Sequence, residues 1–122
     1  MKVPQPLGGV YDRITILRIK QRRIEDPARL EHVARELAAL SACWEAEGLP
    51  QPEQAAALEA VNEELWVVED LLREHETRGD FGPRFVELAR SVYVLNDRRA
   101  ALKRALSEAL GSELVEVKSY SS

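Results

Sequence analysis

Residues 58–72 of the chain read LEAVNEELWVVEDLL. Apolar side chains recur every three or four residues along this stretch, at Leu58, Val61, Leu65, Val68 and Leu72. Because an α-helix has about 3.6 residues per turn, side chains with this spacing lie on one face of a helix. The stretch therefore predicts an amphipathic helix, which we place at residues 53–78 because Pro52 precedes it and Gly79 follows it.

The same pattern occurs in three further segments, separated by residues that begin or end helices. Those residues are Asp26-Pro27, Gly48, Pro83 and Gly111. They predict helices at residues 9–25, 27–47 and 83–110, after an irregular start that contains Gly8 and Gly9. Short connections make consecutive helices antiparallel neighbours. We therefore predict an all-α fold in one domain, with four antiparallel amphipathic helices forming a bundle or paired long hairpins with coiled-coil-like seams.

The C-terminal tail, residues 112–122, differs from the helices. Leu114, Val115 and Val117 alternate imperfectly with charged residues, as in a strand. The tail could therefore be an extended segment that lies beside Lys2-Val3. The alternative is a frayed terminus.

The helices at 53–78 and 83–110 are long for a chain of 122 residues. A helix of some 26 residues spans about 39 Å. We expect these helices to project beyond the core and to expose apolar residues such as Trp66, Val67 and Val94. A homodimer would cover such residues, so we predict one. We expect Phe81, in the turn between the two helices, to fold back onto the core.

The composition limits the classes of function. The formal net charge is −4, which gives no global attraction to nucleic acid, and we predict no nucleic-acid partner. Cys43 is the only cysteine, which precludes an intramolecular disulfide and favours a cytoplasmic location. No apolar run approaches the ~18 residues of a membrane span, and the first residues lack the apolar core of a signal peptide, so we predict no membrane association.

Polar residues interrupt the apolar seams of the two long helices. Arg99 lies at a seam position of the fourth helix, with Asn96 and Lys103 one turn away. Antiparallel pairing about residues 79–82 places Asn62 and Glu63 opposite residues 96–99, and Glu69 and Asp70 opposite residues 91–93. A cluster of carboxylates should therefore face a cluster of guanidinium groups.

Two interpretations of these clusters stay open. In the first, Glu–Arg pairs and a buried Asn fix the register of the helices. In the second, a pocket between helices binds a phosphate or carboxylate, which the planar fork of Arg recognises with two hydrogen bonds. The first helix adds Lys20 on the face that we expect Asp12 to share. The candidate anion-binding residues are Lys20, Arg90, Tyr93, Asn96, Arg98, Arg99 and Lys103, and Glu69 or Asp70 would be a general base.

Metal and nucleophilic chemistry have little support in the sequence. Helical di-metal sites use Glu-x-x-His motifs, but Arg29 stands three residues before His32, and Leu72 stands three residues before His75. No serine or cysteine lies in an activating local context, the two scattered histidines make no triad, and no glycine-rich phosphate loop is present. We therefore predict no metal and no cofactor, assign no catalytic residue, and expect both histidines to be exposed.

Several short segments occur in an order that resembles one protein family. The segments are Asp12 to Leu17 with Ile19-Lys20, Leu65-Trp66 with Glu69-Asp70, Asp80-Phe81 with Phe85, Tyr93 with Asn96 to Ala100 and Lys103, and Lys118-Ser119-Tyr120. Together they resemble a family of small bacterial and phage proteins catalogued as domain of unknown function 6165. The chain departs from the family pattern near Gly9, where the family has an acidic residue. The family brings no established activity. The resemblance implies only that these polar residues are candidates for a shared site, and it adds Lys118 and Tyr120 to them.

These observations lead to one main prediction of function and two alternatives. We predict a non-enzymatic helical interaction or ligand-binding module that forms a homodimer. The first alternative is a small enzyme or binding protein for a phosphorylated or carboxylated metabolite, with the Arg/Lys anion site and the Glu/Asp base named above. The second is a helical adaptor that binds a larger glycan- or nucleic-acid-processing enzyme.

Overall fold

The computed structural model describes residues 2–111 and 115–118 of the chain. The described residues form four long helices and two short strands, which confirms the predicted all-α fold. The elements in chain order are β1 (Lys2–Gln5), α1 (Leu7–Arg23), α2 (Pro27–Ala46), α3 (Ala55–Arg78), α4 (Pro83–Ala109) and β2 (Val115–Lys118). Each helix begins and ends within two residues of its predicted position.

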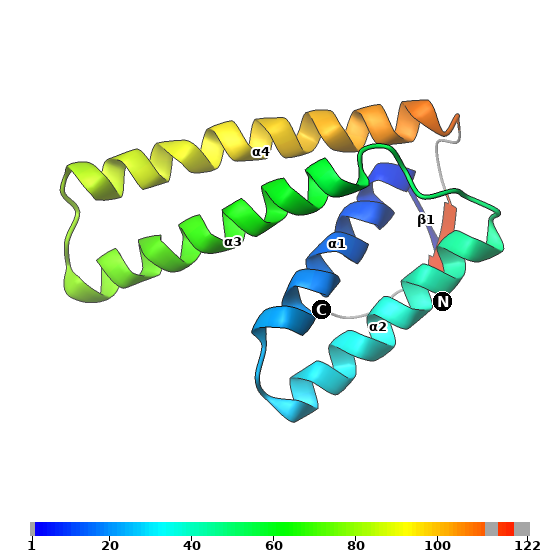
Figure 1. Cartoon of the computed structure of the whole chain (residues 1–122), viewed down its shortest axis with the longest axis horizontal. Coiled ribbons are helices and arrows are strands. Elements are labelled where there is room, and N and C mark those ends of the chain that lie inside the picture. The colour runs from blue at the N-terminus through cyan, green and yellow to red at the C-terminus, as the bar shows by residue number, and fades with distance from the viewer. Residues whose placement is uncertain (1, 112–114, 119–122) are drawn as a thin grey trace.

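The helices form two hairpins that differ in length (Figure 1). The chain turns back after α1 to form α2, and it turns back after α3 to form α4. α1 packs against α2, α3 and α4, so it joins the two hairpins. The far half of the α3–α4 hairpin extends past α1 and α2, as predicted for helices of this length.

The core is concentrated around α1. Nine of the 17 residues of α1 are buried, against three of the 27 residues of α4. Leu7, Ile14 and Leu17 of α1 pack in one apolar cluster with residues of the other three helices. The other buried apolar members include Val33, Leu40, Trp44, Leu58, Val61, Leu65, Leu95 and Leu106. α4 is therefore an outer helix that contributes few side chains to the core.

The helix boundaries follow the residues from which they were predicted. Pro27 is the first residue of α2, and Asp26 before it takes the N-cap position without a hydrogen bond from its side chain. Gly79 ends α3 with a φ of 67°, a left-handed conformation that glycine adopts without a steric penalty. Pro83 is the first residue of α4.

Gly8 lies inside α1 rather than in the irregular start that we predicted, and Gly9, the predicted first residue of this helix, is its third residue. Helix α1 begins at Leu7, and the N–H of Gly8 donates a hydrogen bond of 2.8 Å to Ser107 Oγ of α4. A Cβ atom at Gly8 would lie 2.2 Å from the carbonyl oxygen of Lys103. Glycine is therefore needed at this position because the backbone of α4 crosses α1 at close range.

The C-terminal tail is extended where the structure describes it. Strand β2 pairs antiparallel with β1, with Val117 opposite Val3 and Lys118 opposite Lys2. This pairing confirms the interpretation of the tail as an extended segment beside Lys2-Val3. The chain ends on either side of the helices are thus joined by a two-stranded ladder.

Two predictions at the tip of the long hairpin were wrong. Phe81 is 53% exposed and packs edge-on against Phe85, with 5.1 Å between ring centroids, instead of folding back onto the core. The reason is distance, because the tip projects away from α1 and α2. His75, predicted to be exposed, is only 7% exposed, and its Nδ1 lies 3.1 Å from the carbonyl oxygen of Asp80. The turn after α3 covers its ring.

Candidate functional site

A buried polar cluster joins α1, α3 and α4. Arg99 Nε and Nη2 donate hydrogen bonds of 2.9 and 2.6 Å to the two carboxylate oxygens of Asp12. Asn62 Nδ2 donates to Asp12 Oδ1 at 2.9 Å and to Thr15 Oγ1 at 2.8 Å. Thr15 Oγ1 in turn donates to the carbonyl oxygen of Asp12 at 2.7 Å. Asp12, Thr15 and Asn62 are all buried. We call these four residues the Asp12 cluster.

The electrostatics of the Asp12 cluster favour the ionised pair. Burial, the largest single influence, would raise the pKa of Asp12, but the hydrogen bonds from Arg99 and Asn62, together with the positive charges of Arg99 and Lys103, lower the pKa below its ordinary value of 3.8. The hydrogen bond to Asp12 likewise raises the pKa of Arg99. Each side chain in the cluster has a hydrogen-bond partner, so the arrangement fits the structural interpretation of the interrupted seam.

The structure does not gather the candidate anion-binding residues in one place. The fork of Arg99 already holds the carboxylate of Asp12. Lys103 is half-buried near Asp12 and lines a hollow of about 520 Å³ beside Gly8 and Gly9. Lys20 lies instead on the α2 side of α1, where burial, and then the charge of Arg13, lowers its pKa.

Most of the remaining candidates lie on the exposed surfaces of α3 and α4. Arg90, Tyr93, Asn96 and Arg98 are exposed on α4, and Lys118 is in β2. Glu69 and Asp70 are exposed on α3; Asp70 accepts a hydrogen bond of 2.6 Å from Arg73. Glu69 is close enough to Arg99 to help raise its pKa. Tyr120 lies outside the described residues.

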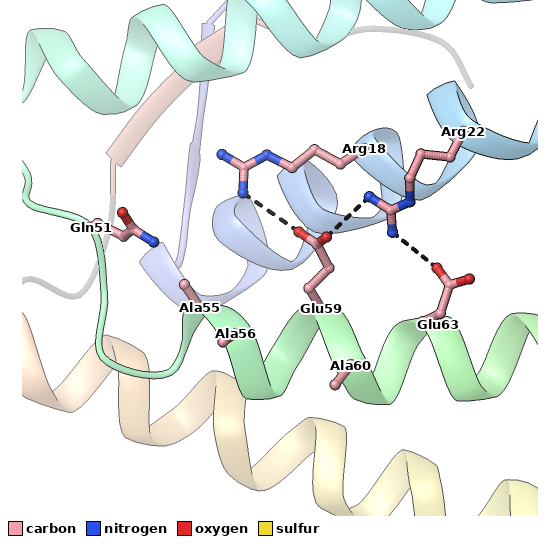
Figure 2. Close-up of a pocket in the computed structure, with 8 residues that line it drawn as sticks. All are labelled: Arg18, Arg22, Gln51, Ala55, Ala56, Glu59, Ala60 and Glu63. Atoms are coloured by element: carbon pink, nitrogen blue, oxygen red, sulfur yellow. Dashed lines mark hydrogen bonds and ion pairs between the residues drawn. The ribbon is translucent and has the colours of Figure 1, made fainter.

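A row of ion pairs between α1 and α3 was not predicted (Figure 2). Arg22 donates to Glu59 at 3.1 Å and to Glu63 at 3.0 Å. Arg23 donates to Glu63 through two nitrogens, and Arg18 lies 3.5 Å from Glu59. Arg18 and Arg22 are four residues apart, as are Glu59 and Glu63. This equal spacing is the sequence feature from which the ion pairs could have been predicted, because residues four apart lie on one face of a helix.

Another ion pair joins α1 to α2. Arg13 Nε and Nη2 each donate a hydrogen bond of 3.0 Å to the carboxylate of Glu36. Glu36 is buried, and the Arg13 side chain is about one-third exposed. Two-pronged Arg–carboxylate contacts therefore join α1 both to α2 of its own hairpin, through this pair, and to α4 of the long hairpin, through the Asp12 cluster.

The outer face of α4 carries exposed apolar residues. Val86, Tyr93 and Val94 are 45%, 74% and 59% exposed. Arg90 and Asp97, exposed as well, lie on the same face, because Arg90 follows Val86 by four residues, and Tyr93 and Val94 each lie three or four residues from both Arg90 and Asp97. Neither Arg90 nor Asp97 forms an ion pair with another described residue. We call these five residues the α4 stripe.

Neither a metal site nor a membrane-spanning helix occurs among the described residues. There, no three His, Cys, Asp or Glu side chains converge on a point where a metal ion could bind. No helix in the described ranges is both long enough and apolar enough to span a bilayer.

Compared with family models, with curated proteins and with solved structures, the chain shows no match in any of the three.

Proposed function

We propose that the protein is a non-enzymatic helical interaction module that forms a homodimer through the α4 stripe. The observation that carries this proposal is the exposure of Val86, Tyr93 and Val94 on the outer helix of a projecting hairpin. Large exposed apolar residues that form a continuous stripe are typical of protein–protein contacts. Tyrosine, the most exposed of the three, is also enriched among the residues that dominate binding energy at interfaces.

The charges of the α4 stripe support a second copy of the chain as the partner. Arg90 and Asp97 lie seven residues apart, with Tyr93 and Val94 midway between them. If two α4 helices cross antiparallel with a two-fold axis between Tyr93 and Val94, each Arg90 lies opposite the Asp97 of the other copy. The same register places Tyr93 of one copy against Val94 of the other. A two-fold interface repeats every favourable contact, so the stripe is self-complementary.

The enzyme alternative has weaker support. Arg99, its central anion-binding residue, is held by Asp12, and Lys20 lies on the other side of α1. Glu69 and Asp70 are exposed on α3 and, within the described part of the chain, line no pocket with the candidate anion-binding residues, which does not favour either as a general base. Membership of the family of domain of unknown function 6165 and a cytoplasmic location stay part of our proposal, on the residue segments and the single cysteine described above.

Charge reversal on the α4 stripe tests the dimer. The oligomeric state is measured by light scattering over a range of concentrations up to high micromolar. The variant Arg90→Asp places two carboxylates opposite each other at both ends of the stripe, and we expect the dimer dissociation constant to rise at least about tenfold. Combining Arg90→Asp with Asp97→Arg restores opposite charges, so we expect the double variant to dimerise again.

A matched control separates the interface from general charge effects. Arg35 is an exposed residue of α2 without an ion pair among the described residues, and Arg35→Asp changes the net charge by the same amount. This control should dimerise like the wild-type chain. A wild-type chain that is monomeric at high micromolar concentration would overturn the proposal. So would a double variant that is no more dimeric than Arg90→Asp alone.

A further inference from the structure

A small hollow lies where α1, α2 and the connection between α2 and α3 meet. It holds about 250 Å³, and it shares Arg18 and Gln51 with the larger hollow drawn in Figure 2. Pockets for drug-sized ligands hold about 300–1,000 Å³, so this hollow fits a smaller molecule. We call it the Arg18 hollow.

Arg18 presents unused hydrogen-bond donors at this hollow. Its Nη1 lies 3.4 Å from Tyr11 Oη and 3.5 Å from Glu59 Oε1, and these are its only polar contacts with described residues. Arg22, one turn further along α1, differs because both of its terminal nitrogens donate to glutamates at 3.0–3.1 Å. A guanidinium group has five N–H donors, so most of those on Arg18 are available to a ligand. Figure 2 shows its side chain extended, with one terminal nitrogen directed at Glu59 of α3.

The aromatic residues beneath Arg18 hold it in a defined place. Its guanidinium carbon lies 5.8 Å from the centre of the Tyr11 ring, within the range of a cation–π contact. Tyr11 packs edge-on against Trp44 with 5.0 Å between centroids, and Trp44 Nε1 donates a 3.0 Å hydrogen bond to the carbonyl oxygen of Pro50. Tyr11 and Trp44 are both buried. A planar fork on a rigid base is suited to bind a carboxylate.

The other side chains of the Arg18 hollow define the rest of the ligand. Glu45 contributes a carboxylate that has no ion pair within the described chain. Ile14 and Leu49 contribute apolar surface. A purely anionic ligand on Arg18 would be repelled by Glu45 and Glu59, whereas a ligand with an added ammonium group would be attracted by them.

We infer that the Arg18 hollow binds a free amino acid with an apolar side chain. Its carboxylate binds the fork of Arg18, and its ammonium group binds the carboxylate of Glu45. Its side chain contacts Ile14 and Leu49. This site shares no residue with the α4 stripe, so amino-acid binding and dimerisation can each succeed or fail independently of the other.

Calorimetric titration with L-leucine and with its two half-molecules tests the ligand class. 4-Methylpentanoate keeps the carboxylate and the alkyl chain, and isoamylamine keeps the ammonium group and the alkyl chain. We expect L-leucine to bind and each half-molecule to bind at least about tenfold more weakly, because each lacks one charge contact. Inorganic phosphate is the fourth probe, and we expect no binding. Phosphate or 4-methylpentanoate binding as tightly as L-leucine would overturn the proposal, and so would no binding of L-leucine at millimolar concentration.

Variants of the hollow test the residues. Arg18→Met removes the charge but keeps the length of the side chain, and Glu45→Gln removes the second charge. We expect each to weaken L-leucine binding at least about tenfold, and Arg18→Lys, which keeps the charge without the fork, to fall between Arg18→Met and wild type. Arg35→Met, on the exposed surface of α2, is the matched control and should bind like the wild type. An unchanged melting temperature shows that each variant is folded. Binding by Arg18→Met equal to that of the control would overturn the assignment.

Discussion

Arg99 of α4 and Asp12 of α1 are joined by two hydrogen bonds, from Nε to Oδ1 at 2.9 Å and from Nη2 to Oδ2 at 2.6 Å. Asp12 belongs to the N-terminal hairpin and Arg99 belongs to the long hairpin, so the pair links the two hairpins across 87 residues of sequence. Asn62 of α3 donates to the same carboxylate, so three helices meet at one buried side chain. We therefore expect this contact to fix the register of α1 on both helices of the long hairpin.

Removing Arg99 should destabilise the fold strongly. Arg99→Met leaves the carboxylate of Asp12, which is 5% exposed, without a cation. Breaking a buried ion pair from one side costs about 3–5 kcal/mol, and we expect the lower end because the Arg99 side chain is 29% exposed. Urea unfolding followed by circular dichroism measures the loss. Arg98→Met is the control, since Arg98 is exposed and adjacent, and it should change stability by less than about 0.5 kcal/mol. Equal effects of the two variants would contradict a structural role for the pair.

The stability that depends on Asp12 should be lost in acid. Its pKa in the folded chain is below the ordinary value of 3.8, so the ionised form stabilises the fold above that pH. Protonation removes this contribution as the pH falls from 3.8 through the folded pKa. Asp12→Asn cannot titrate there, so the difference in unfolding free energy between wild type and Asp12→Asn should narrow as the pH falls.

The comparison with Asp12→Asn is needed because other carboxyl groups titrate in the same range. The hydrogen bond from Arg23 lowers the pKa of Glu63, which gives the wild-type chain a second loss of stability in acid. Subtracting the unfolding free energy of Asp12→Asn from that of the wild type at each pH removes the contribution of Glu63, because Glu63 is present in both proteins. The difference in unfolding free energy between wild type and Asp12→Asn could instead stay constant over about four pH units, from about pH 6 to about pH 2. That result would show that the fold does not stabilise the ionised form of Asp12.

The sequence allowed the elements and part of the cluster to be predicted. Pro27, Gly79 and Pro83 act on the local backbone, so helix boundaries could be placed without knowing the fold. Antiparallel pairing about the 79–82 turn also placed Asn62 opposite Arg99, and both do meet at Asp12. These predictions depend only on local conformation and on the shortest connection between neighbours.

The contacts of α1 could not be predicted in the same way. Its packing against α3 and α4 depends on tertiary geometry that no turn specifies, so Asp12 was not identified as the partner of Arg99. Asp12 and Lys20 were expected to share a face, but eight residues of helix rotate by about 800°, which leaves the two side chains about 80° apart. Lys20 therefore faces α2, beside Arg13 and Glu36, while Asp12 faces α4.

The crossing of α1 and α4 gives a test with an internal control. Gly8→Ala would place a Cβ atom 2.2 Å from the backbone oxygen of Lys103, which cannot move aside as a side chain does. We expect a loss of about 1–3 kcal/mol from this overpacking. Gly9→Ala, at the next residue, meets no atom within 4 Å, and it should stabilise the helix by up to about 1 kcal/mol. Urea unfolding of both variants measures the two opposite effects. A neutral Gly8→Ala would mean that α4 does not cross α1 at this residue.

The ion pairs of Figure 2 should contribute much less stability than their number implies. The side chains of Arg22 and Glu63 are 50% and 33% exposed, and pairs this exposed are worth about 0.2–1 kcal/mol. We therefore expect Arg22→Met to lower the unfolding free energy by less than about 1 kcal/mol, and about 1 M salt to remove most of that difference by screening. Arg13→Met is the variant to compare with Arg22→Met. The partner of Arg13 is Glu36, whose side chain is only 7% exposed and would be left buried without a cation. The effect of Arg13→Met should be larger than that of Arg22→Met and should persist in salt. Equal and equally salt-sensitive losses for the two variants would show that burial does not distinguish the pairs.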